Sequence, residues 1–225
     1  MHRSRILPAL AALALALPAA ARAQGCIGAP VPEGGRAFQL QGAANTYADA
    51  PEIEGPGIGA SFRGNPGGIL AYSAEYSYAS VSDGIPVHGG GAMLAVRAPI
   101  SVARLAICAR GGVMASRFSD SPSATELDNV TFPVGVVVEL PLALGEGRAL
   151  VPYVAPQYLF SRTTGEILGL GYEDTGNAIG VEAGLGVRVR RAAVTVGGNF
   201  SELPETLITP AVPRQSLFLR VGVLF

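Results

Sequence analysis

The sequence contains no Lys and no Trp, and charged residues make up only 15% of its 225 residues. Arg supplies all 16 basic side chains, and no block of Arg alternates with aromatic residues. Because the formal net charge is −1, a basic surface for nucleic acid is excluded. Apolar residues reach 49%, and this share with so little charge excludes a disordered chain.

Side chains that bind metals or attack substrates are equally scarce. The chain has two Cys far apart in sequence, and His88 is the only His beyond the first five residues. Without a C-x-x-C or paired-His spacing, we expect no metal site and no cofactor. His88 begins the string His-Gly-Gly-Gly, which also occurs in the oxyanion loop of some esterases. The chain has no G-x-S-x-G nucleophile elbow, however, so we predict a protein that is not an enzyme.

A continuous apolar run occurs only at the N-terminus. Arg3 and Arg5 precede the apolar residues 6–17, and Ala21-Arg22-Ala23 matches an A-x-A cleavage site. The run is shorter than the roughly 20 residues that a spanning helix needs. We therefore predict that residues 1–23 are a cleaved secretory signal peptide for the general export route. If the mature chain spans a membrane, it must do so with strands closed into a barrel.

Most of the mature chain alternates between apolar residues and small or polar ones. At the C-terminus, every second residue is large and apolar: Leu217, Leu219, Val221, Val223 and Phe225. A period of two is typical of a β-strand with one apolar face. The pattern predicts ten strands, at residues 36–47, 57–64, 69–79, 91–98, 102–116, 129–140, 149–161, 177–190, 193–201 and 215–225.

The links between these segments alternate in length. They are short after the second, fourth, sixth and eighth strands and longer after the others, and most Asp and Glu fall in the longer links. This predicts an all-β fold, a closed antiparallel transmembrane β-barrel at residues 36–225, with both termini periplasmic and long acidic loops outside. Eight strands are the alternative, if residues 57–64 and one neighbouring segment are not strands. Residues 24–35 form an irregular lead.

The two faces of the strands indicate which solvent surrounds the barrel. The apolar face is nearly uninterrupted, whereas the other face is mainly Gly, Ala and Ser with one or two charges per strand. Such a face suits a crowded interior, and the apolar face suits lipid. Because isolated charges in a narrow interior are costly, we expect a paired network there. Its predicted members are Glu75, Arg97, Arg104, Arg110, Glu139, Glu182, Arg188, Arg190 and Arg220.

The whole mature chain, with its alternating strands and final Phe225, resembles the small OmpA/OmpX-like outer-membrane β-barrels of Gram-negative bacteria. The resemblance implies a monomer in the outer membrane, in contact with outer-membrane lipid and lipopolysaccharide. It also implies that the C-terminal strand is the signal that the barrel-assembly machinery recognises. It rests on pattern and not on a motif, so it assigns no functional residues.

The two cysteines are expected in an oxidising compartment, where such residues commonly pair. Cys108 has the same parity as Arg104 and Arg110, so it should face the interior. Cys26 lies ten residues before the first strand, a length that reaches up to about 33 Å when extended. We predict that a Cys26–Cys108 disulfide tethers the lead inside the barrel as a small plug. Two free thiols are the alternative.

Three functions agree with these features. The preferred one is a structural or surface-interaction role through acidic external loops, with an interior largely filled by side chains. The first alternative is a narrow channel for ions or small solutes, because ten strands leave room for little more than a slim path. The second alternative is a lipid or peptide hydrolase that uses His88 at the outer rim.

Overall fold

The computed structural model describes residues 26–49, 52–67, 69–81, 84–98, 105–120, 124–202 and 213–225. The predicted signal peptide, residues 1–23, lies outside the described residues. Within the described ranges, no helix is long and apolar enough to cross a membrane.

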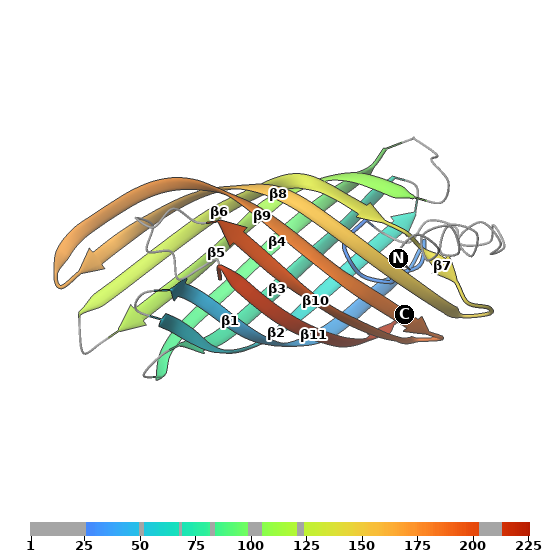
Figure 1. The fold of residues 1–225 in the computed structure, drawn as a ribbon, viewed down its shortest axis with the longest axis horizontal. Coiled ribbons are helices and arrows are strands. Elements are labelled where there is room, and N and C mark those ends of the chain that lie inside the picture. The colour runs from blue at the N-terminus through green and yellow to red at the C-terminus, as the bar shows by residue number, and fades with distance from the viewer. Residues whose placement is uncertain are drawn as a thin grey trace, which may run out of the picture.

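The described part of the chain forms one antiparallel sheet that closes on itself (Figure 1). Each strand pairs with the next along the chain except β6, which pairs with β8 and not with β7, and the sheet closes where β1 pairs with β11. The two-residue β7 only lines the edge of β8, so ten strands make the barrel, as predicted. The strands are β1 (Arg36–Asp49), β2 (Glu52–Gly67), β3 (Leu70–Val81), β4 (Ile85–Arg97), β5 (Ala106–Asp120), β6 (Thr125–Glu139), β7 (Leu142–Ala143), β8 (Arg148–Ile167), β9 (Leu170–Val189), β10 (Ala192–Glu202) and β11 (Gln215–Leu224).

The alternation in the sequence becomes two faces of the barrel wall. On β11, Leu219 and Val221 are each 51% exposed, whereas Phe218 and Arg220, which alternate with them, are buried. Every strand of the barrel follows this rule, because successive side chains of a strand point to opposite faces. The exposed aliphatic and aromatic residues therefore form a belt around the outside, and the polar residues line the interior.

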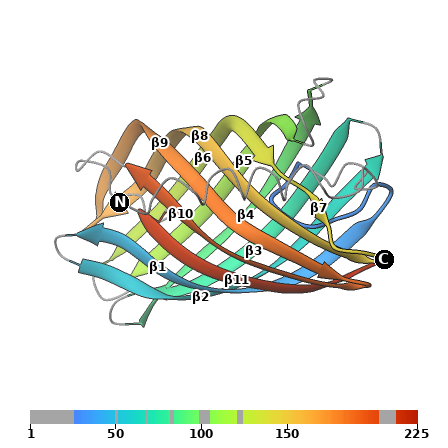
Figure 2. The ribbon, with the colours of Figure 1, turned by 45° about the vertical axis from the view of Figure 1, so that its right-hand side comes forward.

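The first and last strands form the seam of the barrel. Their register runs from Ala37 opposite Leu224 to Thr46 opposite Gln215. The backbones of Arg36 and Phe225 exchange two hydrogen bonds, of 2.9 and 3.0 Å, at the end of this ladder. We call this end of the barrel, which also carries the β9–β10 turn, the terminal end. The β8–β9 turn lies at the opposite end (Figure 2).

The strands are longer than the sequence pattern predicts, and this corrects the expected loops. Residues predicted as loops at 80–90, 117–128 and 162–176 belong largely to strands that continue past the apolar belt. β8 and β9 each have 20 residues, although roughly 9–11 suffice to cross a bilayer. The outer faces of these extensions carry charged residues such as Arg117, Glu126 and Arg162 in place of the apolar stripe, although Val81, Val87 and Leu127 are buried on the inner face. Their backbones pair as regularly as those in the belt.

Candidate functional site

Residues 26–35, the N-terminal segment, fold back into the terminal end of the barrel (Figure 1, blue). Cys26 forms a disulfide with Cys108 on β5, with a Cα–Cα distance of 5.8 Å. Ala29 and Val31 are fully buried. Around the segment, six strands each contribute a buried Ala: Ala37, Ala71, Ala95, Ala106, Ala155 and Ala193. The wall therefore carries small side chains where the segment lies.

Two charged side chains of the wall bind the backbone of the N-terminal segment. The amide of Gly28 donates a 2.9 Å hydrogen bond to Oε1 of Glu139 on β6. Arg63 on β2 donates through Nη1 to the carbonyl of Ile27. Both side chains are buried, at 0% and 4% exposure, so their charges act in a region of low dielectric constant. The segment thus contacts one inward carboxylate and one inward guanidinium.

Two glycines make the close packing of the segment sterically feasible. Gly28 has a φ of +63°, and a Cβ there would lie 2.7 Å from the Tyr153 ring. On the wall, a Cβ at Gly186 of β9 would lie 2.9 Å from the ring of Pro30. Any larger side chain at either position would push the segment away from the wall.

Further along the interior, Glu182 on β9 is the centre of an ion network. Its carboxylate lies 3.1 Å from Nη1 of Arg110 and 3.3 Å from Nη1 of Arg220, and it accepts a 2.9 Å hydrogen bond from the Tyr153 hydroxyl. Arg110 also donates to Gln157 at 2.7 Å, and Arg220 donates to Gln41 at 2.6 Å. The network crosses the interior and joins strands that are distant in sequence.

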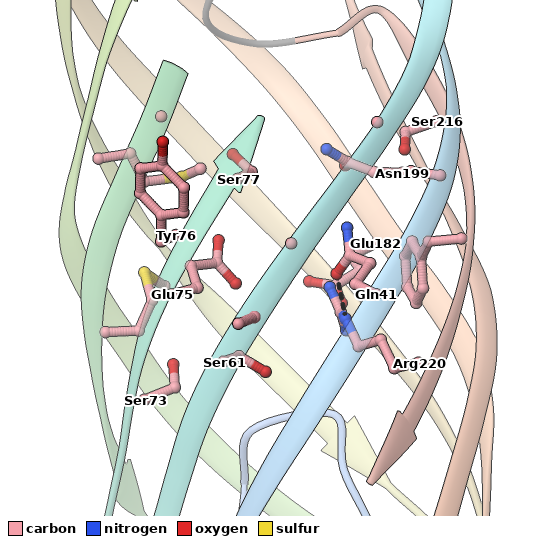
Figure 3. Close-up of a pocket in the computed structure, with 18 of the residues that line it drawn as sticks. Gln41, Ser61, Ser73, Glu75, Tyr76, Ser77, Glu182, Asn199, Ser216 and Arg220 are labelled. Atoms are coloured by element: carbon pink, nitrogen blue, oxygen red, sulfur yellow. Dashed lines mark hydrogen bonds and ion pairs between the residues drawn. The ribbon is translucent and has the colours of Figure 1, made fainter. Parts of the chain in front are cut away.

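A cavity of about 190 Å³ lies between this network and the wall formed by β2 and β3 (Figure 3). Gln41, Glu182 and Arg220 line one side of it, and Glu75 lines the other beside Ser61 and Ser73. Glu75 lies 3.9 Å from Arg63, and its side chain is 31% exposed. Cys26 and Ile27 also line this cavity, so the N-terminal segment forms its floor.

Comparison with protein-family models found no match, and comparison with curated proteins found none either. Among solved structures, the β domain of the Bordetella autotransporter BrkA is similar over 85% of this chain and 99% of that domain, with a TM-score of 0.52 and 12% identity. The fold is that of a small outer-membrane β-barrel. At this identity, the likeness concerns the fold alone.

Two other solved outer-membrane β-barrels are similar at lower scores. The translocator domain of the autotransporter NalP from Neisseria meningitidis has a TM-score of 0.49 and 12% identity, over 97% of this chain and 95% of that domain. Ail, the attachment invasion locus protein of Yersinia pestis, has a TM-score of 0.40 and 12% identity, over 86% of this chain and 99% of that protein.

Within the barrel, most of the charged residues expected inside do face the interior. Arg110, Glu182 and Arg220 form the ion network, Glu139 binds the N-terminal segment, and Glu75 lines the cavity. Arg97 and Arg188 also point inward, because each is opposite a buried residue, Cys108 or Ala193, in the register. Arg104 lies outside the described residues.

The predicted position of Arg190 is wrong. It is exposed at the turn after β9 with a φ of +55°, because β9 ends one residue earlier, at Val189. Arg63 was missed, although it has the same parity as Ser61 and the opposite parity to Phe62. Its segment is rich in Gly, and the weak alternation there hid the two faces.

His88 lies on β4 and not in a loop, and its side chain is exposed on the outside of the barrel. Its Nδ1 lies 2.8 Å from the Tyr76 hydroxyl, and its ring packs edge-on against Tyr78 with the centroids 5.1 Å apart. These contacts place the imidazole among aromatic residues, as in the aromatic girdles of membrane barrels. They supply neither a nucleophile nor an acid, so they give the hydrolase hypothesis no support.

Proposed function

We propose that this chain is a non-enzymatic outer-membrane barrel with a closed interior, which acts as a structural or surface-interaction protein. The observation that carries this proposal is the N-terminal segment, which is buried in the terminal end and forms the floor of the cavity. In this proposal both termini are periplasmic, so the segment closes the periplasmic mouth. The opposite end, with the β8–β9 turn, faces the outside of the cell.

The charged strand extensions support a role at the external surface. Outward-facing ion pairs join Arg117 to Glu126 on β5 and β6, and Arg162 to Glu173 on β8 and β9 at 2.8 Å. These side chains are 51–62% exposed. Exposed pairs contribute only about 0–1 kcal/mol to stability, so stabilisation of the fold does not account for these charges. We assign them to contact with the lipopolysaccharide headgroups and other surface partners.

The apolar belt supports the remaining part of the proposal. Leu217, Leu219, Val221, Val223 and Phe225 on the last strand are 51–65% exposed, which suits contact with lipid. We propose that the same stripe is what the barrel-assembly machinery recognises, and that the barrel is a monomer.

Conductance in planar lipid bilayers tests the closed interior. We expect the refolded protein with its disulfide intact to insert without producing steady current steps, because the N-terminal segment blocks the path. Alkylation followed by mass spectrometry verifies that the cysteines are paired in the sample. Sustained ohmic conductance of this oxidised protein would contradict the proposal and favour an open channel.

A further inference from the structure

We propose that the interior of the barrel is an anion path, and that the N-terminal segment is its gate. Withdrawal of the segment converts the closed barrel into a narrow anion-conducting pore. This inference rests on the closed resting state proposed above and adds a second, conducting state with a defined ion preference.

The charges along the interior favour anions. Around the cavity and the N-terminal segment, five guanidinium groups face inward with only three carboxylates. They are Arg63, Arg97, Arg110, Arg188 and Arg220, with Glu75, Glu139 and Glu182. Pores lined by Arg or Lys select anions, because the fixed positive charge replaces part of the hydration of the ion and repels cations.

The segment covers polar groups that suit a water-filled mouth. Glu139 and Nη1 of Arg63 both bond to the segment backbone, so withdrawal of the segment frees the Glu139 carboxylate and Nη1 of Arg63 for water, while Nε of Arg63 keeps its contact with Ser61. At the same end of the barrel, the side-chain amide of Gln39 and Nε of Arg188 have no hydrogen-bond partner among the described residues. In a wall that is never in contact with water, buried polar groups normally have hydrogen-bond partners.

The wall also leaves space for a path once the segment is gone. The residues that pack against the segment are mainly the six buried Ala described above, each from a different strand. Gly186 adds a seventh position without bulk, where Pro30 now lies. The segment therefore fills much of the space at the terminal end, beside larger strand side chains such as Val137 and Leu224.

The segment is held by its disulfide and by its packing against the wall, where Gly28 lies on Tyr153 and Pro30 on Gly186. We call this packing the seat, and both the disulfide and the seat must be removed to release the segment. A triple variant, Cys26→Ser, Cys108→Ser and Gly28→Val, removes the disulfide and drives a side chain into Tyr153 from a residue with a positive φ. All changes except Cys108→Ser lie in the segment itself, so the strands are left nearly untouched. We call this the release variant.

A matched control keeps the seat while losing the disulfide. It combines the two Ser substitutions with Gly34→Asn, because Gly34 also has a positive φ, +76°, but has nothing within 4 Å of a Cβ. Asn tolerates that backbone conformation better than other residues. A second release variant carries Gly186→Val in place of Gly28→Val and attacks the seat from the wall.

The measurement is single-channel recording in planar bilayers with a KCl gradient. We expect steady current steps from the release variants, with a reversal potential displaced from zero toward the equilibrium potential of chloride. The control should show far rarer steps. Adding Arg188→Gln to the release variant should shift the reversal potential toward that of potassium. Release variants that are folded, as judged by heat-shifted gel migration, and still silent would overturn the gate.

A reversal potential on the potassium side would overturn the anion path. These results differ from the one that would contradict the proposed closed interior, which is conductance of the oxidised wild-type protein before any substitution. If the Gly186→Val protein does not fold, the Gly28→Val protein decides the question, because its barrel wall keeps every glycine.

Discussion

Glu182 compensates part of the positive charge of the barrel interior. It pairs with both Arg110 and Arg220, whose side chains are only 8% exposed. Removing one partner from such a buried network leaves a charge without compensation, which is far more costly than the loss of an exposed pair. Phe218 adds to the stabilisation of Arg220, whose guanidinium lies 3.9 Å above its ring centroid.

The substitution Glu182→Gln tests this balance while it keeps the shape of the side chain. We expect it to lower the free energy of unfolding by about 3–5 kcal/mol, because two buried guanidinium groups lose their shared carboxylate. Urea titration of the folded protein in lipid vesicles measures the change.

Glu173→Gln on the same strand is the control, since it breaks the exposed pair with Arg162. Exposed pairs contribute little, so the expected cost is below about 1 kcal/mol. Equal costs for the two substitutions would show that the interior is solvated like the surface, against the buried network.

At the scale of elements, each strand has a section inside the lipid and a polar extension beyond it. On β6, Val130, Phe132, Val134 and Val136 are exposed in succession on the outer face, and Glu126 and Asp128 precede them on the same face. The change from apolar to acidic residues along one face marks where the membrane ends. The strand itself continues, because pairing of the backbone does not depend on which solvent the side chains meet.

The substitution Val134→Arg tests the position of the lipid section. Val134 is 54% exposed at the middle of the apolar face, so a charge there should cost about 2–4 kcal/mol of folding free energy. The measurement is again unfolding by urea in vesicles.

Gly171→Arg on the β9 extension is its control, because Gly171 is exposed and has nothing within 4 Å of a Cβ. The expected cost there is about 0–1 kcal/mol. If both substitutions were equally tolerated, the outer face of β6 would be in water, and the belt would have another function.

At the scale of the whole molecule, the closed barrel could be predicted because lipid imposes a strict rule on one face of every strand. Leu217 to Phe225 obey it without exception, so the direction of Arg220 follows. The strand extensions could not be predicted in the same way, because their polar residues face water on the outside whether they form strands or loops. Residues 162–176 show this, since only their pairing with neighbours makes them strand.

The candidate site was predictable only in part, for a related reason. The alternation along each strand placed Cys108, Arg110 and Glu182 inside. It does not give the position of a side chain along the barrel axis, nor which side chains are in contact across the interior. Tyr153 and Gln157 gave no signal in the sequence, because their roles arise only from contacts across the interior with Glu182 and Arg110. Arg190 shows the limit at a strand end, where one residue decides between interior and turn.

Migration in detergent gels tests the closed barrel in the membrane most directly. A membrane barrel resists unfolding by detergent at room temperature, because its backbone hydrogen bonds form a ring without free edges. We predict that the mature protein is recovered in the membrane fraction, and that unheated and boiled samples migrate at different apparent masses. A protein that stays in the soluble fraction and migrates identically with and without boiling would contradict the account.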